Sequence, residues 1–270
     1  MMRRIGMILC AAVLCAGVVL LGGYIKRLRS AANVNEELTR IYNEDASAAE
    51  TARQKDNAAE AAPSETQRKV PADKDYQYIG SEVLAECRTL QKINSDLVGW
   101  LNVPGELDLP VVYRDNSYYL NHDFYKRDND SGTVFLDEAH PFEADTQYLF
   151  LHGHNVWDGS MLGNLTHYRN TEYIKENPYL YFNTLYRRET YEIIGVMRVT
   201  QQEMYGLMRL GTPTFENGAE FNSFIESLRS RALRFTDKEI APDDALLAIS
   251  TCWENDRIVV LFRRTDRSEG

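Results

Sequence analysis

Two side chains near the end of the chain could together attack a carbonyl group. Cys252 ends the apolar run Leu247–Cys252, and Arg257 opens the run Arg257–Phe262. Both runs are typical of buried β-strands, and if the strands are neighbours a short loop brings the thiol close to the guanidinium. A thiolate needs a positive neighbour to form near neutral pH, and a tetrahedral oxyanion needs a fixed donor. The competing interpretation is a buried cysteine at a strand end beside a surface arginine.

A second candidate group lies upstream, where His152 and His154 stand at the end of the apolar run Gln147–His152. Residues two apart on a strand share a face, so both rings could bind one metal ion if a third ligand were present. Alternatively, one histidine is the proton-transfer partner of Cys252, fixed by the strand and left accessible by the loop that follows. Both rings could also be hydrogen-bonded without any chemistry. The remaining histidines fall in predicted loops and are expected at the surface: His122, His140 and His167.

Short strands in quick succession are predicted to position these side chains. Besides the two C-terminal strands, apolar runs predict strands at residues 99–103, 109–113, 132–137, 147–152 and 189–199. A helical period over Ser81–Val98, with Ser81 as a plausible N-cap, predicts one amphipathic helix, and a second surrounds Phe221–Leu228. Short helical turns are expected at residues 118–120 and 160–165. Many short strands with few helices are typical of a β-barrel or sandwich with helical insertions.

Charge and cysteine content narrow the class of protein. The formal net charge of -10 argues against a nucleic-acid partner. Of the four cysteines, Cys10 and Cys15 fall in the apolar N-terminal run, so only Cys87 and Cys252 remain for the rest of the chain. These two could form one disulfide, but no dense disulfide framework exists. Cys87 follows the apolar period of its helix, which favours a role in the core.

The N-terminus predicts a membrane anchor over residues 1–30. The run Ile5–Ile25 holds 21 residues without a charge, about the length that spans a bilayer. A cleaved signal peptide would usually have a shorter apolar core and a small-x-small site before a polar mature start, whereas basic residues follow this run directly. Those basic residues outnumber the ones before the run, so the positive-inside rule alone would place the C-terminal side in the cytoplasm.

The segment after the anchor is predicted to be a mobile stalk. Residues 31–75 are rich in Ala, Glu, Asn, Gln and Lys, with little apolar surface to bury. Folded structure is expected to start near Tyr76, which gives a single domain over residues 76–270.

Several blocks of the chain, in order from about residue 81 to 262, resemble class B sortases. The opening block Val98–Gly105 is similar to the family pattern VGWL-x-x-PG, and Asp115–Phe124 is similar to DN-x-YYL-x-HDF. Two departures stand where substrate would lie: His152 replaces a usual tyrosine, and the short loop between Cys252 and Arg257 carries Trp253. Further matching blocks are Leu109–Val112, Gly132–Asp137, Gly153–Val156, Asp158–Leu162 and Leu247–Cys252.

The resemblance implies a closed β-barrel of about eight strands with an N-terminal helix and short helical insertions. It implies a membrane-anchored cysteine transpeptidase that cleaves a C-terminal sorting signal after threonine through a thioacyl-enzyme. The new end is passed to an amine of peptidoglycan, or alternatively of a pilin. The domain would lie outside the cell, against the charge rule. The mechanism needs neither cofactor nor metal.

The resemblance also assigns site residues. Cys252 is the nucleophile, His154 protonates the leaving amine and accepts a proton from the incoming one, and Arg257 stabilises the oxyanion or positions the peptide. The residues implied in the peptide groove are Asn116, Leu120, His152, Ser250 and Thr251.

Two other classes of protein fit less well. A papain-type cysteine hydrolase would place its nucleophile at a helix N-terminus with the histidine downstream, but here the histidine comes first and the cysteine ends a strand. A non-catalytic anchored binding module would keep the fold without the three polar residues, which are all present.

Overall fold

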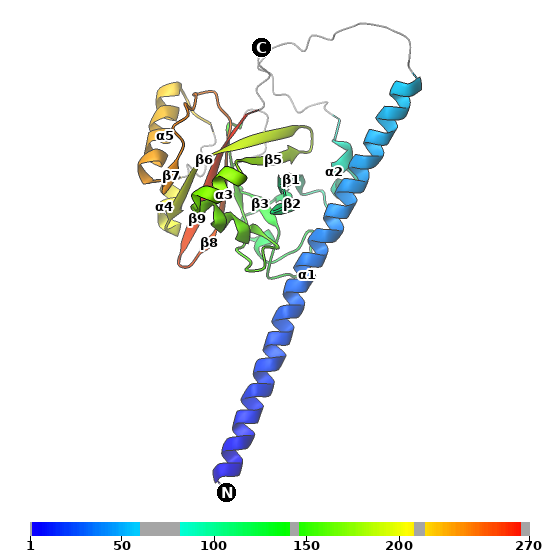
Figure 1. The fold of residues 1–270 in the computed structure, drawn as a ribbon, viewed down its shortest axis with the longest axis vertical. Coiled ribbons are helices and arrows are strands. Elements are labelled where there is room, and N and C mark those ends of the chain that lie inside the picture. The colour runs from blue at the N-terminus through cyan, green and yellow to red at the C-terminus, as the bar shows by residue number, and fades with distance from the viewer. Residues whose placement is uncertain (1, 60–81, 141–145, 208–213, 266–270) are drawn as a thin grey trace.

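The computed structural model describes residues 2–59, 82–140, 146–207 and 214–265 (Figure 1). In these ranges one sheet runs in the order β5-β1-β2-β3-β4-β8-β9-β6-β7, and an additional pairing between β5 and β6 closes it into an eight-strand barrel. Two pairs, β2–β3 and β4–β8, are parallel, and the other pairs are antiparallel. This mixed barrel with helical insertions confirms the predicted fold class. The strands are β1 (Leu97–Val103), β2 (Leu107–Tyr113), β3 (Val134–Leu136), β4 (Tyr148–His152), β5 (Tyr179–Thr184), β6 (Arg188–Val199), β7 (Arg234–Phe235), β8 (Leu246–Trp253) and β9 (Asp256–Arg264).

Helices cover two sides of the barrel. On one side lie α4 (Gln201–Leu207) and α5 (Gly218–Arg231), and on another α1 (Met2–Ala59) and α2 (Ala85–Ile93) (Figure 1). The remaining helical elements are η1 (Tyr118–Leu120), η2 (Leu162–Arg169) and α3 (Thr171–Glu176).

Alternation along the strands divides the apolar side chains into three clusters. Leu149, Leu151, Leu247 and Ile249 belong to the cluster inside the barrel. Their strand neighbours on the opposite face belong to a second cluster, which α4 and α5 cover. The third lies under α1 and α2. Because both faces of β4 and β8 are buried, these two strands form a stiff support for the residues at their ends.

Helix α1 packs against the barrel along a stripe of apolar side chains. Ala31, Val34, Leu38 and Tyr42 are buried, and the Tyr42 ring stacks on Trp100 at a centroid distance of 4.4 Å. This packing differs from the mobile stalk predicted for residues 31–75. The prediction rested on composition, which does not detect apolar residues repeated at helical spacing. Residues 60–81, including the predicted domain start at Tyr76 and the predicted N-cap Ser81, lie outside the described residues.

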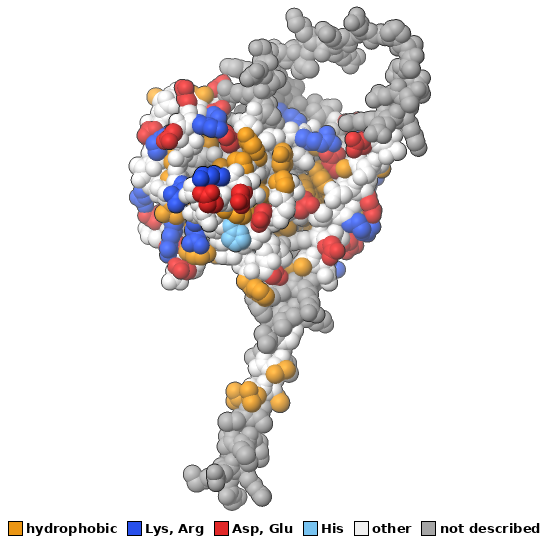
Figure 2. Space-filling model, viewed as in Figure 1, with side chains coloured by type: hydrophobic (Ala, Val, Ile, Leu, Met, Phe, Trp, Pro, Cys, Tyr) orange, Lys and Arg blue, Asp and Glu red, His pale blue; other side chains and the backbone are white. Residues whose placement is uncertain are grey.

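The N-terminal part of α1 projects beyond the domain (Figure 1). Figure 2 shows apolar side chains on this projecting part, where Val13, Leu14 and Val18 are exposed. Most side chains of the predicted anchor Ile5–Ile25 lie outside the described residues. Within the described part of the chain, no helix has both the length and the apolar character needed to cross a membrane.

Helix α2 is shorter than the helix predicted over Ser81–Val98, since residues 97 and 98 belong to β1. Cys87 is buried on the face of α2 that meets α1, as the helical period predicted. Burial is the main cause that raises the pKa of its thiol to about 12. This thiol therefore stays protonated and serves as apolar filling in the core.

Candidate active site

The nucleophile candidate and its arginine face each other across one hairpin. In the register of β8 and β9, Cys252 pairs with Arg257, and Trp253 pairs with Asp256 before the turn. The guanidinium Nη1 of Arg257 lies 2.9 Å from Sγ of Cys252. A guanidinium only donates hydrogen bonds, so the sulfur is the acceptor in this contact. The thiol–guanidinium pair expected from the two apolar runs is present in the structure.

The tip of this hairpin is held from two sides. Arg198 of β6 bonds Asp256 Oδ2 through Nε at 2.6 Å and Glu254 Oε2 through Nη2 at 3.0 Å. The guanidinium of Arg169 stacks over the Trp253 ring at 3.6 Å from its centroid. These contacts restrict the short loop next to Cys252, where the chain departs from the class B pattern.

The parallel pair β4–β8 brings the histidines to the same end of the barrel. His152 pairs with Ser250, and His154 and Cys252 each lie two residues farther along. Two hydrogen bonds hold the ends of the chain segments together: Thr251 Oγ1 donates to Gly153 O at 3.0 Å, and Asn155 Nδ2 donates to Cys252 O at 2.7 Å. The segment around His154 and the end of strand β8 are therefore fixed to each other directly.

The hydrogen bond of His154 defines which ring nitrogen is available for proton transfer. Nε2 lies 2.8 Å from the carbonyl oxygen of Leu120. A carbonyl oxygen accepts only, so Nε2 carries a proton. Neutral His154 is then the Nε2–H tautomer, with Nδ1 as its basic atom.

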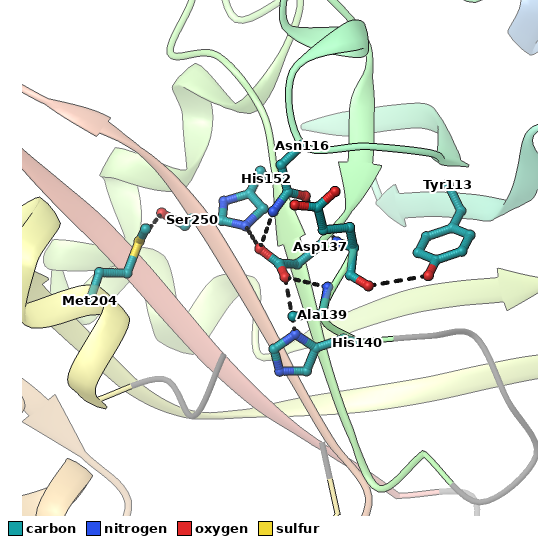
Figure 3. A network of polar contacts seen from close by, with 9 residues as sticks. Tyr113, Asn116, Asp137, Ala139, His140, His152, Met204 and Ser250 are labelled. Atoms are coloured by element: carbon teal, nitrogen blue, oxygen red, sulfur yellow. Dashed lines mark hydrogen bonds and ion pairs between the residues drawn. The ribbon is translucent and has the colours of Figure 1, made fainter. Parts of the chain in front are cut away.

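His152 belongs to a different network, centred on the buried carboxylate of Asp137 (Figure 3). Asp137 Oδ2 accepts from His152 Nε2 at 2.8 Å and from Asn116 Nδ2 at 3.0 Å, and Oδ1 accepts from the Ala139 amide at 2.9 Å. His140 Nδ1 lies 3.5 Å from Oδ1. Burial alone would raise the pKa of Asp137, but the hydrogen bonds from His140, His152 and Ala139 outweigh it, and this pKa lies well below its usual range. Asp137 is therefore ionised and orients the His152 ring.

The surface position predicted for His140 is wrong. Its backbone N–H bonds Asp137 O at 2.9 Å, so the chain turns directly after β3 and places the ring on Tyr148, with 0% of the residue exposed. His122 is half-buried and its ring stacks on Tyr118 at 4.0 Å. His167 is exposed, as predicted.

The residues predicted for the peptide groove have different surroundings. Asn116 and His152 are half-buried in the Asp137 network, and Leu120 holds His154 through its carbonyl. Ser250 is buried and donates from Oγ to Met204 Sδ of α4 at 3.5 Å. Thr251 is 0% exposed and its hydroxyl bonds Gly153. Thr251 thus supports the strand end from inside the barrel.

Two polar residues at the site have no role in the sequence-based prediction, Asp137 and Asn155. Asp137 ends a predicted strand, but that position does not indicate its partner His152, 15 residues away. Asn155 follows His154, but nothing local indicates that it bonds the backbone of Cys252, 97 residues away. Among the described residues, no group of three His, Cys, Asp or Glu side chains could hold a metal ion.

Curated proteins similar to this chain are sortase B proteins. No family model matches the chain. Sortase B of Listeria monocytogenes is 27% identical over 189 residues, which cover 67% of this chain and 75% of the relative.

Two solved structures extend the likeness to the fold. A Bacillus anthracis protein described as similar to sortase B superimposes with a TM-score of 0.67 and 26% identity, covering 86% of this chain and 94% of the other. A Staphylococcus aureus sortase B–substrate complex gives a TM-score of 0.62 and 25% identity, covering 69% and 88%. The chain therefore belongs to the sortase B family and is a cysteine transpeptidase of that type.

Proposed function

We propose that this transpeptidase cleaves the C-terminal sorting signal of an exported protein after threonine and transfers the new end to an amine of peptidoglycan. The contact of 2.9 Å between Cys252 Sγ and Arg257 Nη1 is the observation that carries this proposal. A sulfur held against a fixed cation is an activated nucleophile beside an oxyanion donor. The S. aureus sortase B has been solved as a complex with substrate, which supports a substrate-binding role for this chain as well.

The first half-reaction uses all three polar residues. Sγ of Cys252 attacks the carbonyl carbon of the threonine, and the guanidinium of Arg257 stabilises the oxyanion that forms. The C–N bond then breaks as the oxyanion collapses. The leaving nitrogen takes the Nδ1 proton of protonated His154, whose Nε2–H stays bonded to Leu120 O. The product of this step is a thioacyl-enzyme and a released C-terminal peptide.

The second half-reaction reverses the proton flow. An amine attacks the thioacyl carbonyl and loses a proton to His154 Nδ1, and the C–S bond breaks to restore Cys252. His152 and Asn116, both hydrogen-bonded to Asp137, contribute to the peptide groove. A pilin amine as acceptor would use the same chemistry.

Residues 1–30 would anchor the protein in the cell membrane as a single pass, with the domain over residues 76–270 outside the cell. The uncharged run Ile5–Ile25 and the exposed Val13, Leu14 and Val18 support this placement. Protease added to intact protoplasts should digest the domain. A protected domain, or a mature chain that starts after Ser30, would contradict it.

A panel of sorting-signal peptides with an added amine tests the chemistry. Both the thioacyl-enzyme and the transpeptidation product are followed by mass spectrometry. Cys252→Ala should abolish both species, whereas the matched Cys87→Ala should retain activity because that thiol is buried in the core. Full activity of Cys252→Ala would refute the mechanism.

A further inference from the structure

One polar residue of α1 lies on the side of the helix that faces the catalytic domain. Asn35 follows Ala31 by four residues and precedes Leu38 by three, which places it on the buried apolar stripe. It is half-buried, whereas its neighbour Glu36 is exposed. The helix is fixed at this level, because Leu38 is 0% exposed and Asn183 Nδ2 donates to Tyr42 OH at 2.7 Å.

The side chain of Asn35 bonds the loop that follows His154. Its Nδ2 donates to Ser160 O at 2.6 Å and lies 3.6 Å from Met161 Sδ. These contacts join residues 125 and 126 positions apart in the sequence. They connect the N-terminal helix to residues 155–161, which we call the histidine loop.

The histidine loop is built as one compact unit. Its base is closed by the hydrogen bond from Leu162 N to His154 O at 3.0 Å, and its tip by Gly159 N to Val156 O at 3.0 Å. Gly163 must be glycine, since a Cβ there would lie 2.2 Å from Val156 O. A displacement at Ser160 is therefore passed to the backbone of His154 and to the Asn155–Cys252 hydrogen bond.

A cavity lies beside the contact of Asn35 with the loop. Its volume is about 560 Å³, and its lining includes Asn35, Glu36 and Thr39 of α1 together with Asp158 and Ser160 of the histidine loop. The loop and the helix are thus separated by open space next to this hydrogen bond. Loss of the bond would leave the loop room to move.

We propose that Asn35 is a positioning residue for His154, which acts through the histidine loop. The N-terminal helix is then part of the active-site scaffold as well as the connection to the proposed anchor. This inference rests on the proposed role of His154 in proton transfer. It predicts that an N-terminal side chain far from the reacting atoms controls the turnover rate.

Full-length variants in the peptide–amine assay test this role. Asn35→Asp keeps the shape but loses the donor, Asn35→Ala removes the side chain without adding charge, and Asn43→Asp is a matched control at an exposed site of the same helix. Each Asn35 variant should lower kcat by between about 10-fold and 100-fold with little change in KM, because small misplacements of a catalytic group are costly. The limb of the pH–rate profile that reports His154 should also move.

A double-mutant cycle with His154→Ala separates positioning from a general loss of stability. If Asn35 acts through His154, Asn35→Asp should have no further effect on single-turnover acylation in the His154→Ala background. Equal effects of Asn35→Asp in both backgrounds, or activity equal to that of Asn43→Asp, would overturn the inference. If His154→Ala itself has wild-type activity, the proposed function fails instead.

Discussion

Cys252 and Arg257 are register partners in the β8–β9 hairpin, and the guanidinium of Arg257 contacts the sulfur at 2.9 Å. The guanidinium donor therefore belongs to the same hairpin as the proposed nucleophile. Its position is set by strand pairing and by Arg198 at the hairpin tip, so it does not depend on bound substrate to be placed.

Arg257→Lys should lower kcat by about 100-fold or more, since a point charge on a flexible stem cannot reproduce a planar donor aimed at the sulfur and the oxyanion. Steady-state kinetics of transpeptidation by the wild type and the variant give the change in kcat. The control Arg40→Lys alters an exposed arginine of α1 away from the hairpin and should retain most activity. Similar rates for Arg257→Lys and the wild type would exclude a role for the guanidinium geometry.

The two histidines should respond differently to truncation. His154→Ala should reduce turnover severely while the fold remains intact, because it removes the proton carrier. His152→Ala should be milder and should change peptide preference more than rate, since its ring is committed to Asp137. Competition between sorting-signal peptides distinguishes these effects. An inactive His152→Ala beside an active His154→Ala would show that their roles are reversed.

The Asp137 network should make stability depend on pH. The pKa of Asp137 is lower in the folded protein than the usual value near 4. The contribution of its ionised carboxylate to the free energy of unfolding is therefore fully present above about pH 4 and is lost as the pH falls toward the folded-state pKa. Denaturant unfolding measured between about pH 3 and pH 7 detects this. Asp137→Asn should remove this pH dependence and cost about 1–3 kcal/mol, because one buried donor loses its acceptor.

If Asp137→Asn loses as much stability on acidification as the wild type does, other carboxylates cause the pH dependence and the prediction for Asp137 is wrong. Asp115→Asn is the comparison variant, since hydrogen bonds from Ser117 mainly lower the pKa of that acid to about 2 while its side chain remains 45% exposed.

Leu38→Ala should destabilise the folded protein by about 2–5 kcal/mol, because the side chain fills a wholly buried site between α1 and the barrel. Asn33→Ala on the exposed side of the helix is the matched control. Thermal unfolding of both variants gives the comparison. A neutral Leu38→Ala would mean that α1 is a free tether after all.

The sequence was sufficient for the elements with strong local patterns. Apolar runs predicted β8, β9 and β4, and the pairing of a thiol with a guanidinium followed from the short distance between two of these runs. The β5 strand and the two-residue β7 were not predicted, although Tyr179–Thr184 alternates between exposed and buried positions. The alternation is a local signal, whereas a strand of two residues offers none.

The parts that could not be predicted depend on contacts between distant segments. The register between Phe135 and His152 sets Asp137 beside His152, and the fold of the whole barrel places Asn35 beside Ser160. No periodicity within a single segment encodes these neighbours.

The parallel pairing of β4 with β8 also has a kinetic consequence. His152 and Ser250 are 98 residues apart in the sequence, and bringing them together costs the entropy of closing a long loop, which slows folding. The catalytic constellation is therefore complete only once the C-terminal strands have closed the barrel. A partly synthesised or partly folded chain carries His154 without its cysteine neighbour, and so the enzyme acquires its acyl-transfer activity only as its last strands dock.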